Sequence, residues 1–262
     1  MAGDGYVNPG RPSLLCSLLA IFLTLTPTCF TNLPAQPTAP SFFLWAWERP
    51  EDLSFIDPHR TGVAYLAGTV WLRGPDVVIR PRLQPLKLPE STHVIAVVRV
   101  ETRKAALTTD QCSRCAREII RFLPLDGLRA LQIDFDASVS ERPFYAALLS
   151  DLRSRLPQSL GLSITALASW CTWDDWLSDL SIQEAVPMLF RMGRDRDQVI
   201  GYLQKNGGFG VKKCRGNAGI STDEPIRYLP PCKALYIFNP RPWSSVELDR
   251  MTDEVRQWRE SN

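Results

Sequence analysis

Short apolar runs follow one another along the chain from residue 42 onward, and most of them are separated by segments with helical spacing. Strands are expected where apolar residues run together or alternate, and helices where they recur every three or four positions. The predicted strands are 42–47, 62–67, 93–100, 128–136, 160–168, 184–192, a segment within 210–220, and 234–239. The predicted helices are 109–122, 140–156 with Ser140 as its cap, 173–180, 194–205 and 244–260.

One connection differs from this alternation. After the second strand, the runs 69–73 and 77–80 are separated by Gly74, Pro75 and Asp76, which are typical turn residues. We therefore expect a β-hairpin insertion where a helix would normally follow.

Eight strands with intervening helices indicate the α/β class. A chain of 262 residues with 45% hydrophobic composition can form one large core. We predict a single (β/α)8 TIM-like barrel over residues 41–262. An open doubly wound sheet is the alternative, and the absence of a glycine-rich nucleotide-binding fingerprint after a strand counts against it. In a barrel, the carboxyl ends of the strands form the site.

The N-terminal residues have the pattern of an export signal. Arg11 precedes an apolar run from Leu14 to Leu25, which is shorter than the roughly 20 residues that span a bilayer. We predict a signal peptide over residues 1–30, with an uncleaved anchor as the alternative, and a proline-rich linker over 31–40. The barrel is then exported to the periplasm or the extracellular space, with no membrane span after signal removal.

Charge is balanced along the chain. Thirty basic and 28 acidic residues give a formal net charge of +2, without a block of one sign. We expect no nucleic-acid partner and a monomeric protein. The sequence predicts no cofactor.

The cysteines suggest a disulfide. Export favours bridges, and Cys214 and Cys232 flank a loop rich in glycine and proline, so this pair is the disulfide candidate. Cys112 and Cys115 open a predicted helix, as a local bridge or as two free thiols. A zinc or redox site would need a second ligand pair or a thioredoxin-like context, so no metal site is predicted.

The most informative chemistry lies in the fourth strand. Gln132, Asp134 and Asp136 alternate with Ile133 and Phe135, so on a strand the three polar side chains share one face. Carboxylates are costly in strands and need partners, water or a function. The two acids are the predicted catalytic residues, and a like-charged neighbour would help Asp136 to keep its proton. The alternative is a structural cluster that Arg99 or Arg191 neutralises.

Other strand ends supply candidate binding residues. Indole rings stack on the apolar faces of sugars, and carboxylate, guanidinium and amide groups bind hydroxyls. Each could equally serve packing or face solvent. With Gln132, the predicted substrate-binding residues are Trp47, Glu48, Glu101, Trp170, Arg191 and Asn239.

The fourth strand resembles that of family 18 glycoside hydrolases, the chitinase-like TIM barrels whose motif is Asp-x-Asp-x-Glu. On that resemblance Asp136 stands at the position of the acid, and Asp134 at that of the residue that orients the substrate's acetamido nucleophile. Gln132 replaces the first Asp, and Asp136 is one methylene shorter than the Glu of the motif. The run from residue 42 to about 239 is also similar to a bacterial exported family of unknown function that is grouped with glycosidase barrels.

Two functions therefore remain open. The first is an exported glycoside-hydrolase-like enzyme that acts on a polysaccharide or oligosaccharide. The second is a barrel without catalysis that binds a glycan or another envelope partner through the same cleft. An enzyme requires both acids to face an open cleft, whereas a structural cluster would be closed by arginine or aromatic side chains.

Overall fold

The computed structural model describes residues 40–103, 106–124 and 127–261. All of them lie in one compact unit, Pro37–Asn262. The predicted signal peptide and nearly all of the predicted linker lie outside the described residues.

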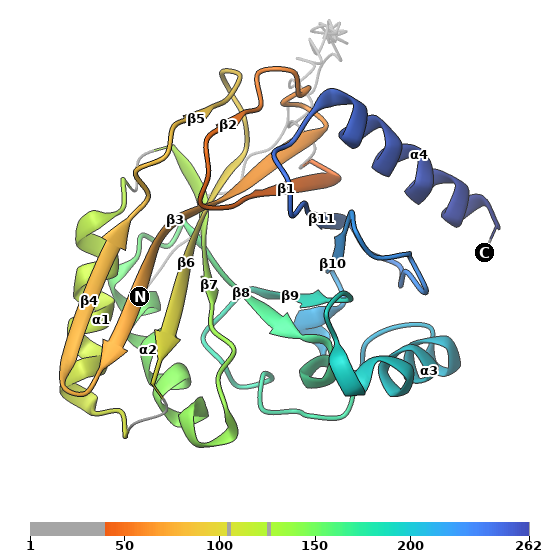
Figure 1. Cartoon of the computed structure of the whole chain (residues 1–262). Helices are drawn as coiled ribbons and strands as arrows, with labels where there is room; N and C mark the ends of the chain where they lie inside the picture. The colour runs from red at the N-terminus through yellow and green to blue at the C-terminus, as the bar shows by residue number, and fades with distance from the viewer. Residues whose placement is uncertain (1–39, 104–105, 125–126, 262) are drawn as a thin grey trace, which may run out of the picture. The chain divides into compact units, whose positions relative to one another are not determined.

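Eight parallel strands form a closed barrel, as predicted. Each strand pairs with its neighbours in the order of the chain, and β1 pairs with both β3 and β11, which closes the ring. Figure 1 shows the helices outside this ring. The barrel strands are β1 (Phe42–Ala46), β3 (Thr61–Arg73), β6 (Val94–Thr102), β7 (Leu128–Asp134), β8 (Gly161–Leu167), β9 (Glu184–Met188), β10 (Asn217–Ser221) and β11 (Ala234–Phe238).

The predicted hairpin is present, but its first arm is not a separate strand. β3 continues through a bulge between Leu66 and Gly68 and then pairs antiparallel with β4 (Asp76–Pro81). The break that the sequence suggested is therefore a bulge, where one extra residue interrupts the register without ending the strand. A small parallel sheet of β2 (Glu51–Asp52) and β5 (Leu86–Lys87) was not predicted.

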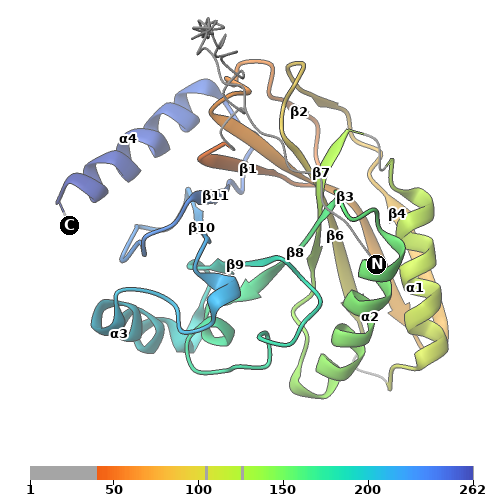
Figure 2. The same ribbon diagram turned by 180° about the vertical axis from the view of Figure 1, so that it is seen from behind.

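Four α-helices accompany the barrel in the described part of the chain: α1 (Thr109–Phe122), α2 (Arg142–Arg155), α3 (Arg196–Asn206) and α4 (Ser245–Ser261). The helices α1 and α2 lie side by side, and α1 also lies against β4 (Figure 2). None of the described helices is long and apolar enough to cross a membrane.

Two predictions about helices were wrong. Residues 173–180 form turns, and the short 3-10 helix η2 (Ala168–Cys171) precedes them. The N-terminus before α2 is capped by Ser138 rather than Ser140, because Glu141 in η1 (Val139–Glu141) accepts hydrogen bonds from the backbone and hydroxyl of Ser138. This is a capping box, two residues earlier than the expected cap. Further 3-10 helices are η3 (Gly193–Asp195) and η4 (Lys212–Cys214).

Aromatic rings fill the barrel interior. Phe43 stacks on Tyr236 with ring centroids 4.8 Å apart, and Trp45 lies 5.4 Å from the same ring. Two glycines make room for them, because a Cβ atom would come within 2.4 Å of the Phe43 ring at Gly62 and within 2.8 Å of the Trp45 ring at Gly219. The packed rings form the base on which the carboxyl end of the barrel is built.

The predicted disulfide was wrong in one of its partners. Cys214 is bonded to Cys171, with a Cα–Cα distance of 5.9 Å, and Cys232 is a free thiol. Cys112 and Cys115 are also free and buried, and burial raises their pKa values to about 11 and about 12. They are therefore unreactive helix thiols rather than a local bridge.

Candidate functional site

A cavity of about 340 Å³ opens at the carboxyl ends of the barrel strands. This is the end at which TIM barrels carry their sites. Both predicted catalytic residues line it. The lining residues are Trp45, Trp47, Arg99, Asp134, Asp136, Thr165, Leu167, Ala168, Ser169, Met188, Phe190, Arg191, Met192, Asp195, Val199 and Phe238.

The two acids differ in their surroundings. Asp134 ends β7 and is 9% exposed, whereas Asp136 lies two residues beyond the strand and is exposed. The Thr165 hydroxyl on β8 donates a hydrogen bond to Asp134 Oδ1 over 2.6 Å. One carboxylate is thus fixed in the wall, and the other faces the opening.

The arginines do not close this site. Arg99 pairs with Asp134 in the β6–β7 register, but its Nη1 is 3.9 Å from Asp134 Oδ2, and its Nε donates to Glu101 Oε1 over 2.6 Å. Arg191 pairs with Asp223 at 3.5 Å instead of with either acid. Arg99 thus makes a long ion pair with Asp134, while both acids still line the open cavity.

Burial shifts the acids toward their protonated forms. It raises the pKa of Asp134 to about 6, against smaller lowering effects from the Thr165 hydrogen bond and Arg99. Loss of hydration also raises the pKa of Asp136, while Arg99 lowers it. The neighbouring charge proposed from the sequence contributes to the Asp134 pKa, but desolvation is the larger cause.

Replacing Asp134 by Asn should stabilise the protein at pH 8 by up to about 3 kcal/mol. Folding raises the pKa of the Asp134 carboxyl group from 3.8 to about 6, so the folded state binds the carboxyl proton more tightly than the unfolded state. The stability of the wild type therefore falls as the pH rises from about 4 to above 6. Asn stays neutral and keeps an oxygen that can accept from Thr165. The measurement is chemical unfolding of both proteins at pH 3.5, 6 and 8.

The gain should nearly disappear at pH 3.5, where Asp134 is protonated in the folded state and mostly protonated in the unfolded state. The matched control is Asp76→Asn, an exposed carboxylate at the start of β4, which should show no such gain at pH 8. A loss of stability at pH 8 in Asp134→Asn would mean that the ion pair with Arg99 outweighs desolvation.

Aromatic side chains form the wall on the β1, β9 and β11 side of the cavity. The rings of Phe190 and Phe238 are stacked with centroids 5.7 Å apart. Trp47, predicted from the sequence, meets Phe238 edge to face at 6.1 Å, and Trp45 lies 6.1 Å from Phe190. The Arg191 guanidinium lies 4.9 Å from the Phe238 ring.

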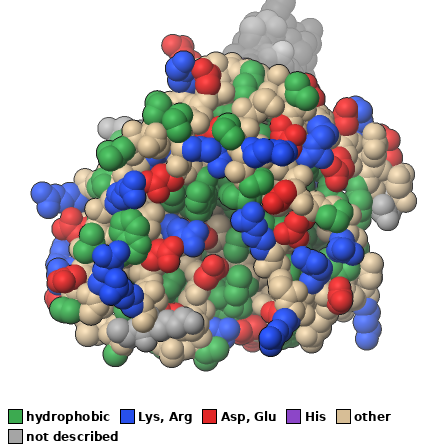
Figure 3. Space-filling model, viewed as in Figure 1, with side chains coloured by type: hydrophobic (Ala, Val, Ile, Leu, Met, Phe, Trp, Pro, Cys, Tyr) green, Lys and Arg blue, Asp and Glu red, His purple; other side chains and the backbone are tan. Residues whose placement is uncertain are grey.

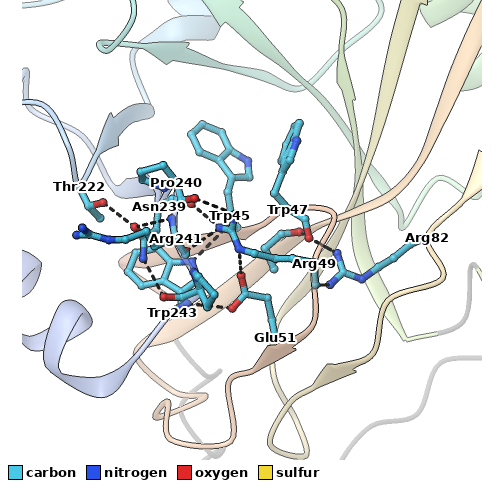
Figure 4. Close-up of polar contacts among 12 residues, drawn as sticks. Trp45, Trp47, Arg49, Glu51, Arg82, Thr222, Asn239, Pro240, Arg241 and Trp243 are labelled. Carbon is cyan, nitrogen blue, oxygen red and sulfur yellow. Dashed lines mark hydrogen bonds and ion pairs between the residues drawn. The ribbon is translucent and has the colours of Figure 1, made fainter.

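The segment that carries Trp47 is held by arginine side chains (Figure 4). Arg82 donates to the carbonyls of Trp47 and Arg49, and Arg49 donates to those of Asn239 and Pro240. The buried carboxylate of Glu51 accepts from Arg49 Nε over 2.7 Å and from the Trp243 backbone over 3.0 Å. These contacts join the ends of β1 and β11, and so fix one edge of the aromatic wall.

Five predicted binding residues do not line this cavity. Gln132 is fully buried inside the barrel, where it accepts from Trp45 Nε1 over 3.0 Å. Glu48 is exposed and pairs with Arg80 at 3.2 Å. Trp170 is buried against Trp176 with ring centroids 5.0 Å apart.

The fourth, Asn239, is 1% exposed, and its side-chain oxygen accepts from the Thr222 hydroxyl over 2.8 Å. A fifth residue, Glu101, lines an adjoining cavity rather than this one. Of the predicted binding residues, only Trp47 and Arg191 therefore line the first cavity.

The sequence alone did not single out several residues of the cavity. Thr165 lies on β8, and Phe190, Asp195 and Phe238 lie at or after the ends of β9 and β11. Their positions near strand ends were a usable signal. To tell which of these side chains face the cavity, however, one must know to which side of the strand each residue points. Among the described residues, no group of His, Cys, Asp and Glu is placed to hold a metal ion.

The surface around the barrel is mixed in charge. On the face shown in Figure 3, the described acidic and basic side chains are interspersed, with hydrophobic side chains between them.

Two solved structures have related chain traces. The spore cortex-lytic enzyme SleL of Bacillus cereus has 16% sequence identity and a TM-score of 0.44, over 70% of this chain and 51% of that one. The chitinase domain of the spore coat protein CotE from Clostridium difficile has 13% identity and a TM-score of 0.38, over 61% of this chain and 52% of that one. The chain thus spans about half the length of each.

No curated protein matches this sequence. The expected similarity to a family of unknown function is confirmed in the middle of the chain. Residues 90–186, which include Arg99, Asp134, Asp136 and Thr165, match the family described as Domain of unknown function (DUF3142), so the match spans the centre of the candidate site.

Proposed function

We propose that the protein is a glycoside-hydrolase-like enzyme that acts on a polysaccharide or oligosaccharide. One observation carries this proposal: the carboxyl pair of Asp134 and Asp136 lines the same open cavity as an aromatic wall. Indole and phenyl rings bind the apolar faces of sugar rings, and two carboxyl groups provide the acid and the stabilising charge that glycosidic bond cleavage needs.

The surroundings of the two acids suit different roles. Asp136 is exposed at the cavity and has a raised pKa, which favours the protonated form that a general acid requires. Asp134 is fixed by the Thr165 hydroxyl and lies near Arg99, so it suits a residue that orients the substrate or stabilises developing positive charge. We assign proton donation to Asp136 and the second role to Asp134.

The second candidate is a barrel that binds a glycan without cleaving it. The observation that favours it is the short side chain at position 136, where the resembling motif has Glu. Asp must lie closer to the glycosidic oxygen by one methylene, and a substrate held too far away would be bound and not hydrolysed.

We also propose that the barrel works outside the cytoplasm. The Cys171–Cys214 disulfide supports this, because structural disulfides persist in oxidising compartments. The export pattern of the first residues points the same way.

The test of function is a glycan array probed with the protein, followed by hydrolysis assays on every glycan bound. Release of new reducing ends by the wild type supports an enzyme. Binding without release supports the non-catalytic barrel. If no glycan binds, the saccharide proposal is wrong. Trp47→Ala is the binding control, because loss of its ring should weaken binding to each hit.

A further inference from the structure

A second cavity adjoins the first. It has a volume of about 230 Å³ and lies at the carboxyl ends of β6 and β7, next to η1. Arg99, Asp134 and Asp136 line both cavities. The two cavities therefore meet at the acid pair, and a chain-like substrate cleaved there would place one unit on each side.

The chemistry of the second cavity differs from that of the first. Its own residues add carboxyl groups from Glu101 and Glu141 and hydroxyl groups from Thr102 and Ser138. Among the described residues that line it, four have carboxyl groups and one, Arg99, has a cationic group. The first cavity is aromatic, whereas this one is polar and rich in hydrogen-bond acceptors.

The acidic groups of the second cavity are built into the fold. Glu141 is 6% exposed, and its Oε2 accepts from the Ser138 backbone over 2.8 Å and from the Ser138 hydroxyl over 2.6 Å. The Thr102 hydroxyl donates to its other oxygen. The backbone of η1 thus fixes one carboxylate at the wall of the cavity.

Glu101 is the more accessible acid. Its side chain is 40% exposed, and Arg99 Nε occupies its Oε1. A carboxylate has two oxygens with about four acceptor positions, so one contact with Arg99 leaves room for a ligand. Glu101 can therefore bind a donor group that enters from solvent.

We infer that the second cavity binds a sugar unit with a free amino group, that is, a deacetylated amino sugar within the saccharide chain. An ammonium group has three donors and one positive charge, which match the accessible Glu101 carboxylate and the oxygen acceptors beside it. An N-acetyl group would bring a neutral amide and an apolar methyl group into a polar site. This inference rests on the proposed function and adds a substrate class to it.

The test compares binding of fully deacetylated and fully N-acetylated hexosamine tetramers of equal linkage, by calorimetry at low salt. We expect the wild type to bind the deacetylated tetramer at least about tenfold more tightly, since a charge-assisted hydrogen bond contributes about 1.5–3 kcal/mol. Glu101→Gln should remove most of this preference, and Glu101→Asp should keep part of it because the charge remains.

Glu48→Gln is the matched control. Like Glu101, Glu48 is a partly exposed glutamate paired with an arginine, Arg80, but it lies outside both cavities. Its substitution should leave the preference unchanged, and circular dichroism and thermal unfolding of each variant confirm the fold.

The outcomes separate the two proposals. Equal affinity for both tetramers, or a preference that survives in Glu101→Gln, overturns the amino-sugar inference while the proposed function stands. If neither tetramer binds but other glycans on the array do, the inference is again wrong and the function stands. If no glycan binds, the proposed function itself is wrong.

Discussion

Replacing Asp136 by Asn is expected to lower the rate of saccharide hydrolysis about 10²–10⁴-fold, the range that a general acid contributes. Asn has nearly the same size but no carboxyl proton to give to the leaving oxygen. Asp136 is exposed and lies beyond the end of β7, so the substitution should leave the barrel folded. The measurement is kcat/KM on a glycan cleaved by the wild type, together with the affinity for that glycan.

Affinity should change little, because the aromatic wall and Asp134 remain. The control is Asp76→Asn, which makes the same chemical change at an exposed strand end outside both cavities and should leave the rate unchanged. A rate for Asp136→Asn within threefold of the wild type would exclude Asp136 as the acid. Asp134, whose pKa is about 6, would then be the candidate for the proton donor.

The barrel was predictable because its signals are local. Each strand is a short apolar run, and strands β7 and β8 lie within a residue or two of the bounds expected from periodicity. The acid pair was predictable for a related reason. Two carboxylates in an otherwise apolar strand are costly wherever the strand lies, so they indicate a site before its partners are known.

The errors occurred where distant parts of the chain decide the structure. The segment 173–180 has tryptophans at a spacing that suits a helix, yet the Trp176 ring packs against Trp170 and Tyr145 in a turn. Tertiary packing overrides a weak local preference there. Trp170 was expected in the cleft because it follows a strand, but the direction of its side chain is set by this packing.

The environment of the site also depended on contacts that a single sequence does not reveal. The Arg99–Asp134 pair needs the register of β6 and β7, and the Thr165 hydrogen bond needs that of β8. The arginine contacts to the backbone at Trp47 have no sequence pattern at all, because any surface carbonyl can accept from a guanidinium. Residue types thus predicted the acids, and the fold determined their partners.

Replacing both Cys171 and Cys214 by serine should destabilise the protein by about 4 kcal/mol. The bridge joins residues 43 positions apart, and closing a loop of that length in the unfolded chain accounts for roughly this free energy. Both cysteines are fully buried, so serine also places hydroxyl groups in the core. The measurement is denaturant unfolding of the wild type and the double variant without reductant.

Cys232→Ser is the matched control, because it removes a thiol and leaves the observed bridge intact. It should cost less than about 1 kcal/mol, as expected for a partly exposed side chain. If Cys232→Ser were as destabilising as Cys214→Ser, the bridge would join Cys214 to Cys232, as the loop composition suggested. Peptide mapping without reduction should instead yield the Cys171–Cys214 pair.

The loss of the bridge should also affect the cavity. The bridged loop contains β9 and the Phe190–Arg191 segment that lines the cavity, so without the bridge this wall should be less ordered and glycan binding should be weaker.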